Sequence, residues 1–295
     1  MKKASFLLGL LILCLLLQSG GCRSGSVIVI GSKNFTEQVI LGDLLARHIE
    51  NQTKLKVDRR LNLGGTFICD QALRAGEIDG YVEYTGTAFT AILKNEPIRD
   101  PQEVYRRVKE SYAKEGMEWL KPLGFDNTFA IIIRGEDARR LGIRTISQAA
   151  PYTPKWVPGF SYEFIERADG FKGLSETYNL RFAKSPKVME LGLIYWALAE
   201  KKVDLIAGDF TNGLIAALEL FVLKDDRRYF PPYDAVPVFR SQTLEQYPEL
   251  REVLNMLGGA ISEDEMRKMN YEVDGEEKTV KEVVLEFLEK LEPGT

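Results

Sequence analysis

One short pattern occurs twice in this chain, and it restricts the possible fold more than any other feature. The spacing of Ala72-Leu73, Ile78-Asp79 and Tyr84 is repeated by Ala197-Leu198, Val203-Asp204 and Asp209. Each copy is typical of the end of an apolar helix, a short strand and the turn after it. Chance is an alternative, since helix-to-strand segments of any α/β protein share this pattern. The repeat nevertheless predicts two similar α/β lobes, with Tyr84 and Asp209 at equivalent strand ends.

The first copy continues into a segment that we expect to line a pocket. Residues 80–87 read Gly-Tyr-Val-Glu-Tyr-Thr-Gly-Thr, which predicts a strand, a tight turn and the start of a helix. Ligands of open α/β sheets bind beyond the carboxyl ends of the strands, where Tyr84, Thr85 and Thr87 are placed. The alternative is that Tyr81 and Tyr84 are strand aromatics with one buried face.

Strands and helices alternate through most of the remaining sequence. We predict strands at 27–30, 55–61, 127–134, 180–183 and 203–207, and helices that begin near 36, 66, 101, 162 and 188. Two consecutive prolines predict an extended, stiff crossing at 229–233. Three polar-faced helices are expected to close the chain, with Ser262 and Thr279 as caps.

The N-terminus predicts the cellular compartment. Two lysines precede an uncharged run from Ala4 to Leu17, and small residues follow, so residues 1–21 resemble a signal peptide. The run is too short to span a bilayer comfortably. Cys22 follows two glycines, as does the acylated cysteine of bacterial lipoproteins, although Ser19 stands where that pattern usually has Leu. We expect an extracytoplasmic protein anchored by a lipid on Cys22; ordinary secretion with an incidental thiol is the alternative.

The composition excludes several kinds of chemistry. The chain has one histidine, His48, which we expect to be a solvated helix residue. Of its three cysteines, Cys14 lies in the expected signal peptide, and Cys69 is the one that follows Cys22. These residues cannot form a His/Cys metal cluster, a Cys-His pair or a Ser-His-Asp set. The formal charge of -4 with interspersed signs gives no basic stripe for nucleic acid. We expect no catalysis, no cofactor, no metal and a monomer.

Four motifs occur together and resemble one family. They are Gly31–Gln38 (GSKNFTEQ), Glu83–Thr87 (EYTGT), Asp225-Asp226 with Phe230–Tyr233, and Met269-Asn270-Tyr271. In this combination the chain resembles the substrate-binding component of ABC importers for osmoprotectants such as glycine betaine, choline, carnitine and proline betaine. The resemblance implies an α/β, two-lobed type II periplasmic-binding-protein fold that closes by a hinge motion on a ligand in the cleft.

The resemblance also implies where the lobes begin and end. Lobe I is expected at 22–125 and 233–295, and lobe II at 126–232. The chain is expected to cross between them near 124–127 and 229–233.

A box of aromatic rings is implied for the cationic end of the ligand. A quaternary ammonium has no N–H to donate, so it is recognised by the negative faces of aromatic rings. Tyr84 and Tyr233 match two tyrosines of the family's box, and Phe129 stands where a third is usual. Phe129 keeps the π face and lacks the hydroxyl.

The resemblance assigns other residues to the ligand's carboxylate and to the second lobe. Lys33, Thr87 and Arg167 match the positions that hold a carboxylate, and the guanidinium of Arg167 suits a bidentate contact. Asn127 matches a position that contributes from the second lobe through its backbone carbonyl.

At one position the sequence departs from the family. Asp209 stands where a tyrosine is usual, and Asn212 replaces the commoner Asp before Gly213. A one-residue slip in alignment would place Phe210 there instead, and Asp209 would alternatively only cap the next helix. In the cleft, the Asp209 carboxylate would attract a cation and accept hydrogen bonds. A ligand with N–H donors, or a larger trimethylammonium compound with a polar appendage, is then an alternative to a simple betaine.

We therefore expect a lipid-anchored receptor that delivers a small cationic or zwitterionic solute, such as a betaine, to a membrane permease. One alternative is the same fold binding another cationic amine or an amino-acid-like ligand through Asp209. A ligand-sensing domain, and an enzyme that uses Asp209 as a general base, are the others.

Overall fold

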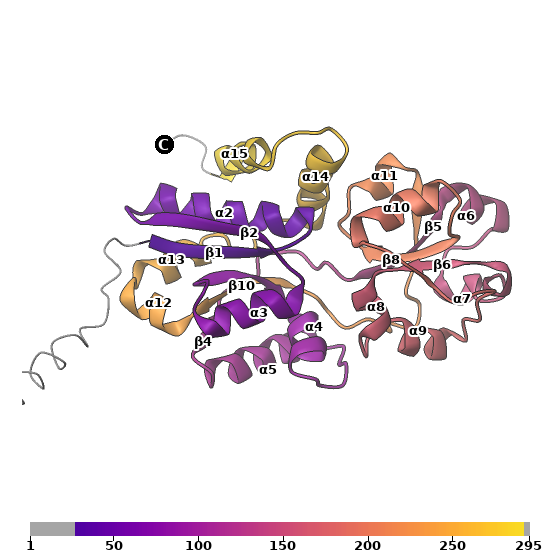
Figure 1. The fold of residues 1–295 in the computed structure, drawn as a ribbon, viewed down its shortest axis with the longest axis horizontal. Helices are drawn as coiled ribbons and strands as arrows, with labels where there is room; N and C mark the ends of the chain where they lie inside the picture. Colours follow the sequence, from indigo (N-terminus) through magenta and orange to yellow (C-terminus); the bar gives the residue numbers. More distant parts are fainter. Residues whose placement is uncertain (1–26, 292–295) are drawn as a thin grey trace, which may run out of the picture.

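The computed structural model describes residues 27–291, and two sheets organise them into two lobes (Figure 1). Lobe I is built on a sheet of order β2-β1-β3-β10-β4, formed by β1 (Val27–Lys33), β2 (Lys56–Gly64), β3 (Gly80–Tyr84), β4 (Met117–Trp119) and β10 (Ala235–Arg240). Lobe II is built on a sheet of order β7-β6-β8-β5-β9, formed by β5 (Phe129–Arg134), β6 (Pro158–Phe160), β7 (Lys187–Val188), β8 (Leu205–Asp209) and β9 (Leu220–Leu223). The expected two-lobed α/β fold is confirmed.

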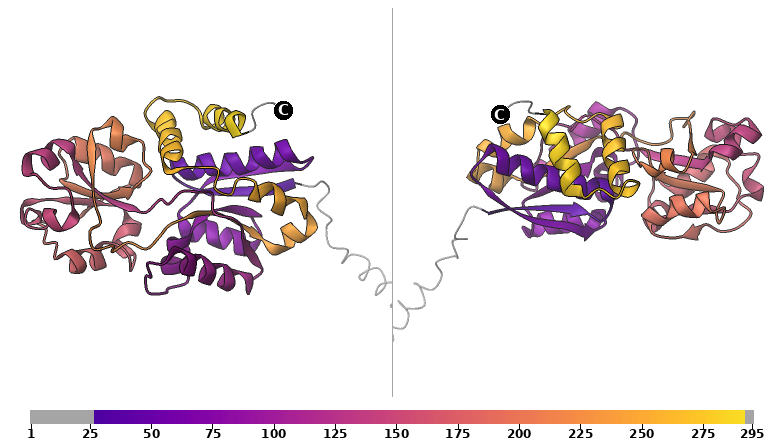
Figure 2. Two further views of the ribbon diagram at one scale, coloured as in Figure 1. Left: turned by 180° about the vertical axis from the view of Figure 1, so that it is seen from behind. Right: turned by 90° about the horizontal axis from the view of Figure 1, so that it is seen from above.

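The two sheets have the same internal layout. In each, three parallel strands are followed by an antiparallel strand and then by an edge strand antiparallel to it. The antiparallel strands β10 and β5 are the ones that the chain enters from the other lobe. The two connections, residues 120–128 and 224–234, therefore run between the lobes together, and they pair at Asp126 and Asp234 (Figure 2).

Helices lie on both faces of each sheet (Figures 1 and 2). In lobe I they are α2 (Thr36–Gln52), α3 (Thr66–Ala75), α4 (Thr85–Thr87), the π-helical turn η2 (Ala88–Ile92), α5 (Pro101–Ala113), α12 (Ser241–Gln246), α13 (Glu249–Asn255), α14 (Glu263–Asp274) and α15 (Val280–Leu291). In lobe II they are α6 (Gly135–Leu141), α7 (Ile146–Ala149), the 3-10 turn η3 (Thr153–Lys155), α8 (Tyr162–Glu166), α9 (Phe171–Tyr178), α10 (Leu191–Ala199) and α11 (Leu214–Ala217). Helices α14 and α15 pack on α2, so the C-terminal part of the described chain belongs to lobe I.

Burial on both faces explains why the parallel strands are continuous apolar runs. In β1, Ile28 and Ile30 pack in the core beneath α2, whereas Val29 points to the opposite side and packs with residues of α3 and α5. Between residues 27 and 291, the structure contains no helix with both the length and the apolar character needed to span a membrane.

Local signals in the sequence correctly place several helix ends. Helix α3 ends at Gly76, whose φ of 72° lies in the left-handed region that favours glycine. Asp100 caps α5 by accepting from the N–H groups of Gln102 and Glu103. Ser262 caps α14, and Thr279 forms a capping box in which its amide donates to the Glu282 carboxylate at 2.9 Å.

The internal repeat is confirmed by equivalent hydrogen bonds in the two lobes. The Asp79 amide donates to the Val29 carbonyl at 2.7 Å, and the Asp79 carboxylate accepts from the Val29 amide at 2.8 Å. Asp204 and Val157 form the same pair at 2.7 and 2.9 Å. Each aspartate precedes the strand of its repeat, so the last residues of β3 and β8 occupy equivalent positions.

Three expectations about secondary structure are wrong. The predicted strand at 180–183 is a loop, because α9 ends at Asn179 with a φ of 53° and the Leu180 amide bonds back to the Ser175 carbonyl. Five strands were not expected, namely β4, β6, β7, β9 and β10, and β10 lies inside the sheet of lobe I. Four helices, α12 to α15, follow β10 in the described chain, where three were expected.

The prediction for His48 is also wrong. Its side chain is fully buried between α2 and α13, with Nε2 2.9 Å from the carbonyl oxygen of Val253. Helix α13 covers the C-terminal end of α2, which the sequence pattern of α2 predicts to be polar and solvated. The predicted signal peptide and Cys22 lie outside the described residues.

Candidate ligand-binding site

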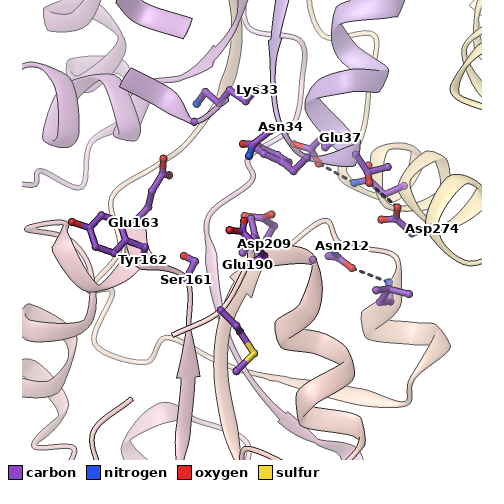
Figure 3. A pocket seen from close by; sticks show the side chains of 18 of the residues that line it. Lys33, Asn34, Glu37, Ser161, Tyr162, Glu163, Glu190, Asp209, Asn212 and Asp274 are labelled. Atoms are coloured by element: carbon purple, nitrogen blue, oxygen red, sulfur yellow. Dashed lines mark hydrogen bonds between the residues drawn. The ribbon is translucent and has the colours of Figure 1, made fainter. Parts of the chain in front are cut away.

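An open cleft with a volume of ≈ 680 Å³ lies between the lobes (Figure 3). Lobe I contributes the N-terminal ends of α2 and α3, and lobe II contributes those of α8 and α10. The strand end at Asp209 lines the same space. The cleft is therefore built where strand ends and helix starts of both lobes meet.

The inner end of the cleft forms a smaller pocket of ≈ 60 Å³. Lys33, Phe35 and Asp209 are among the residues that line both spaces, so the two adjoin. All the ligand-binding residues expected from the sequence line the inner pocket: Lys33, Tyr84, Thr87, Asn127, Phe129, Arg167, Asp209 and Tyr233. The structure brings together residues that lie up to two hundred positions apart in the chain.

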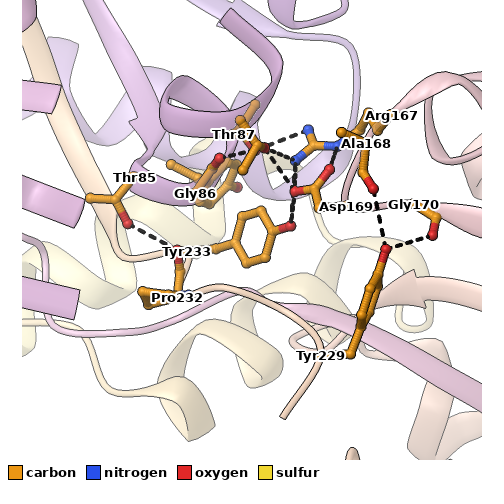
Figure 4. Close-up of polar contacts among 12 residues, drawn as sticks. Thr85, Gly86, Thr87, Arg167, Ala168, Asp169, Gly170, Tyr229, Pro232 and Tyr233 are labelled. Carbon is orange, nitrogen blue, oxygen red and sulfur yellow. Dashed lines mark hydrogen bonds and ion pairs between the residues drawn. The ribbon is translucent and has the colours of Figure 1, made fainter. Parts of the chain in front are cut away.

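Arg167 is held by a carboxylate that we did not single out in the sequence (Figure 4). Its Nε and Nη2 atoms donate to the two oxygens of Asp169 at 2.8 and 2.7 Å. Burial by itself raises the pKa of Asp169, but the charge and hydrogen bonds of Arg167 outweigh burial and hold that pKa below its ordinary value. The guanidinium carbon lies 5.2 Å from the ring centre of Phe129 and 5.7 Å from that of Tyr233. Arg167 thus orders two rings of the expected box.

The Arg167–Asp169 pair also connects the lobes. Thr90 of lobe I donates to Asp169 at 2.8 Å, and Thr87 accepts from Arg167 at 3.3 Å (Figure 4). The Tyr233 hydroxyl, at the end of the second connection, donates to the same aspartate. Thr87 therefore lies beside Arg167, as expected for two residues that would hold one carboxylate.

Lys33 already has a carboxylate partner in the structure. Its ammonium forms a buried ion pair with Glu83, with side chains that are 3% and 0% exposed, and it lies 4.9 Å from the ring centre of Tyr84. Burial raises the pKa of Glu83, while the charge of Lys33 opposes this shift. A ligand carboxylate at Lys33 would share the ammonium with Glu83.

Tyr84 and Asn127 both bond to Glu37, a second carboxylate that sequence reasoning did not single out. The Tyr84 hydroxyl donates to Glu37 Oε1 at 2.6 Å, and the Asn127 amide donates to the same atom at 2.9 Å. The Tyr84 ring also stacks on Phe35, with 6.5 Å between ring centres. Glu37 lies within the GSKNFTEQ motif, which was the available signal for it.

Asp209, and not Phe210, faces the cleft. The guanidinium of Arg267 lies 5.3 Å from the ring centre of Phe210, outside the cleft lining. Nor does Asp209 cap the next helix, because Asn212 Oδ1 accepts from the Leu214 amide at 3.0 Å instead. In the structure, Asp209 therefore lines the cleft, whereas Phe210 does not, and Asp209 does not cap the next helix.

The Asp209 carboxylate has no hydrogen-bond or ion-pair partner among residues 27–291. Burial, and secondly the negative charge of Glu37, raise its pKa to about 7. A group of this kind gains from a cation or a hydrogen-bond donor supplied by a ligand.

The charges around the outer cleft are mainly negative. Its lining contains one lysine, Lys33, and the following acidic residues: Glu37, Glu163, Glu190, Asp209 and Asp274 (Figure 3). Because Lys33 is paired with Glu83, the cleft has an excess of negative charge, which favours a ligand with a cationic group.

Comparisons with known proteins identify solute-binding proteins of ABC transporters as relatives. Residues 26–290 match the family model described as the substrate binding domain of ABC-type glycine betaine transport systems. The carnitine transport binding protein OpuCC of Listeria monocytogenes is 36% identical over 92% of this chain and 88% of its own length. A crystal structure of a glycine betaine/carnitine/choline ABC transporter has a TM-score of 0.77 and 35% identity, covering 89% of this chain and 98% of the other.

A further relative is named for a different solute. The ergothioneine transport permease/ergothioneine binding protein EgtU of Helicobacter pylori is 35% identical over 90% of this chain. The match covers 47% of that protein. The names of these relatives describe transport and binding rather than catalysis.

Proposed function

Because the chain belongs to the family of substrate-binding domains of ABC-type glycine betaine transport systems, we propose that it captures a quaternary-ammonium compatible solute of the glycine betaine type. It is the extracytoplasmic solute-binding component of an osmoprotectant importer, and its two lobes suit closure about the paired connections. The proposal names the class of solute and the residues that bind it.

The observation that carries the proposal is the chemistry of the inner pocket. Tyr84, Phe129 and Tyr233 bring three aromatic rings to a pocket at the end of an acidic cleft. Rings of this kind attract a trimethylammonium by about 0.5–2 kcal/mol for each contact, depending on desolvation. Arg167 and Thr87 lie beside these rings and supply donors for a carboxylate, so a betaine satisfies both ends of the pocket.

Asp209 favours a second candidate within the same function. Its carboxylate has no partner among the described residues, and the outer cleft of ≈ 680 Å³ is large for glycine betaine. A betaine with an additional N–H-bearing ring would place its donors there. Ergothioneine, for which one relative is named, is a betaine of this kind.

Isothermal titration calorimetry tests the ligand class. The panel is glycine betaine, choline, carnitine, ergothioneine and, as cations without a quaternary nitrogen, lysine and arginine. We expect binding of at least one quaternary ammonium compound and no binding of the two basic amino acids. Absence of heat for every quaternary compound would show that the proposed ligand class is wrong.

The same panel separates the two candidates when it is repeated with Asp209→Asn. If Asp209 accepts N–H groups, this substitution weakens ergothioneine binding more than glycine betaine binding. Equal losses for both solutes would count against the second candidate.

The pH dependence of ligand affinity is expected to follow the ionisation of Asp209. Its folded-state pKa is raised to about 7, so the ionised form that attracts a cation is lost as pH falls from 8 to 6. Choline is the suitable probe, because it has no titrating group in this range. Its affinity is expected to fall on acidification in the native chain and to stay nearly constant in Asp209→Asn. A native chain with pH-independent choline binding would contradict this role.

Asp209→Asn, which should weaken ligand binding, is expected to stabilise the fold. A raised carboxyl pKa means that ionisation destabilises the folded chain as pH rises from the ordinary carboxyl range toward 7. Asp209→Asn removes this cost, so its thermal midpoint at pH 8 should exceed that of the native chain. The variant would then be more stable and bind choline less tightly, as expected of a residue kept for function.

We also propose how the chain is placed in the importer. Lobe I would comprise 22–125 and 233–295 and lobe II 126–232, with the crossings near 124–127 and 229–233. A lipid on Cys22 would anchor a monomer to the membrane beside its permease. Metabolic labelling with a radioactive or clickable fatty acid would test the anchor, because Cys22→Ala should abolish incorporation of label.

A further inference from the structure

We propose that Glu37 is a positioning residue whose buried carboxylate joins the two lobes, fixing the ring of Tyr84 and the strand end that carries Asp209. This residue lies at the start of α2 and is 3% exposed. The binding part of the test rests on the proposed function, whereas the structural part does not.

Every acceptor position of the Glu37 carboxylate is used. Oε1 accepts from the Tyr84 hydroxyl at 2.6 Å and from Asn127 Nδ2 at 2.9 Å. Oε2 accepts from the Thr211 hydroxyl at 2.5 Å and from Asn270 Nδ2 at 3.0 Å. A carboxylate has about four acceptor sites, so its shell is complete. The four donors come from β3, the first connection, the turn after β8, and α14, so one side chain contacts both lobes.

All polar groups of Thr211 are hydrogen-bonded, and two of them bond to lobe I. Besides its hydroxyl on Glu37, its amide donates to Asn127 Oδ1 at 3.4 Å and its carbonyl accepts from Asn270 Nδ2 at 3.0 Å. The side chain is fully buried. A Cβ atom at the nearby Gly213 would lie 2.4 Å from Tyr271 Cα, which shows how closely this turn approaches α14. The turn that begins at Asp209 is therefore fixed against lobe I.

The same contacts orient the two amides that bond to Glu37. Because Asn127 Oδ1 accepts from Thr211 and Asn270 Nδ2 donates to Thr211, both amides are oriented with their N–H groups toward Glu37. A Gln in place of Glu37 would therefore point its own N–H group at the N–H group of Asn127 or Asn270. Burial raises the pKa of Glu37 above its ordinary value, and its hydrogen bonds offset only part of this shift. No lysine or arginine between residues 27 and 291 forms an ion pair with it.

When Glu37 is ionised, its charge acts directly on the ligand site. Glu37 bonds to the hydroxyl of Tyr84, whose ring is expected to face the ligand's cation, and it is the main charge that raises the pKa of Asp209. The ligand's cation would therefore be the counter-charge of both carboxylates. One buried residue thus controls ring orientation, lobe register and local charge.

Thr211→Val tests the link without touching the ligand, because Thr211 does not line the cleft and valine keeps its shape. The matched control is Thr243→Val. Thr243 is 4% exposed and its hydroxyl donates to the buried Asp79 carboxylate at 2.7 Å, but both residues lie in lobe I. Each variant loses one hydroxyl bond to a buried carboxylate, and only one of them loses a bond between lobes.

The full chain and both variants are compared by calorimetry with glycine betaine and choline, by thermal unfolding, and by small-angle X-ray scattering without ligand. Thr211→Val is expected to weaken binding by at least about tenfold and to raise the ligand-free radius of gyration. Thr243→Val is expected to lower the thermal midpoint comparably, with affinity and radius unchanged. Glu37→Gln should also weaken binding and raise the radius of gyration. The double variant, Glu37→Gln with Thr211→Val, should bind the solute as tightly as Glu37→Gln alone.

The proposal is overturned if Thr211→Val keeps the native affinity and radius, or if Thr243→Val changes both as strongly. If the native chain binds neither solute, the proposed ligand class fails on its own. The scattering comparison between the two threonine variants then still decides whether Glu37 and Thr211 hold the lobes in register.

Discussion

Arg167→Ala is expected to lower the free energy of unfolding by about 3–5 kcal/mol at pH 7, because it leaves a buried charge without its partner. The side chains of Arg167 and Asp169 are 7% and 0% exposed, so solvent cannot replace the lost guanidinium. The variant also removes the cation that orders Phe129 and Tyr233, and the expected donor to a ligand carboxylate. Urea denaturation measures the loss of stability, and calorimetry should show that betaine binding is abolished.

The stability that Arg167→Ala loses should decrease as the pH is lowered. In the native chain the pKa of Asp169 is held low, so its ion pair stabilises the fold above the ordinary Asp pKa of about 3.9. This contribution is lost as pH falls through the folded-state pKa. Without Arg167, burial raises the pKa of Asp169, and the carboxyl group becomes neutral at a higher pH. The difference between native chain and variant should therefore be largest near neutral pH and shrink below about pH 4.

Arg106→Ala is the control for loss of an arginine. Arg106 forms ion pairs with Glu103 and Glu110, but its side chain is 52% exposed, so water replaces these contacts and stability should change little. A deficit for Arg167→Ala that is no larger than the control, or that persists unchanged in acid, would contradict a buried, partner-dependent Asp169.

Much of the fold was predictable because its signals are local. Helix caps such as Asp100 and Ser262, and the stop at Gly76, depend on residues within one or two turns. Strand β10 was missed because Pro237 lies in its middle, and a proline argues against a strand inside a sheet. The structure pairs Pro237 with Val82, a residue from the other end of lobe I, which no local pattern reveals.

For the site, the sequence predicted the residues that line the pocket but not the carboxylates that hold them. The residues that line the inner pocket follow strand ends or match family motifs, and the structure places them together. Glu37, Glu83 and Asp169 were missed because their roles depend on distant partners: Glu37 and Thr211, for example, lie 174 positions apart. A sequence shows that a carboxylate is present, but it does not show which donors surround it. His48 illustrates the same limit, since a distant helix buries it.

Tyr84→Ala is expected to weaken binding of the solute by about two- to thirtyfold, since each cation–π contact contributes about 0.5–2 kcal/mol and 1.4 kcal/mol corresponds to a factor of ten. The ring is only 5% exposed and lies 4.9 Å from the ammonium of Lys33, so it already faces a cation in the structure. Its hydroxyl also supplies one of the donors to Glu37. The substitution therefore removes a binding surface and leaves a buried carboxylate with an incomplete shell.

Tyr112→Ala separates binding from stability. Tyr112 is fully buried in lobe I, and its hydroxyl donates to Asp70 at 2.9 Å, so it matches Tyr84 in size and bonding but lies away from the cleft. Both variants should lose about 3–5 kcal/mol of stability, the range for truncation of a large aromatic side chain. Only Tyr84→Ala should lose affinity, which is measured by calorimetry at a temperature where circular dichroism shows both variants folded.

Tyr84→Phe then divides the effect between the ring and the hydroxyl. Phenylalanine keeps the π face but removes the donor to Glu37, so its affinity should lie between that of the native chain and that of Tyr84→Ala. If Phe restores full affinity, the ring alone matters for binding. If Tyr84→Ala binds the solute as tightly as the native chain, Tyr84 does not face the cation, and the aromatic box must be built from other residues.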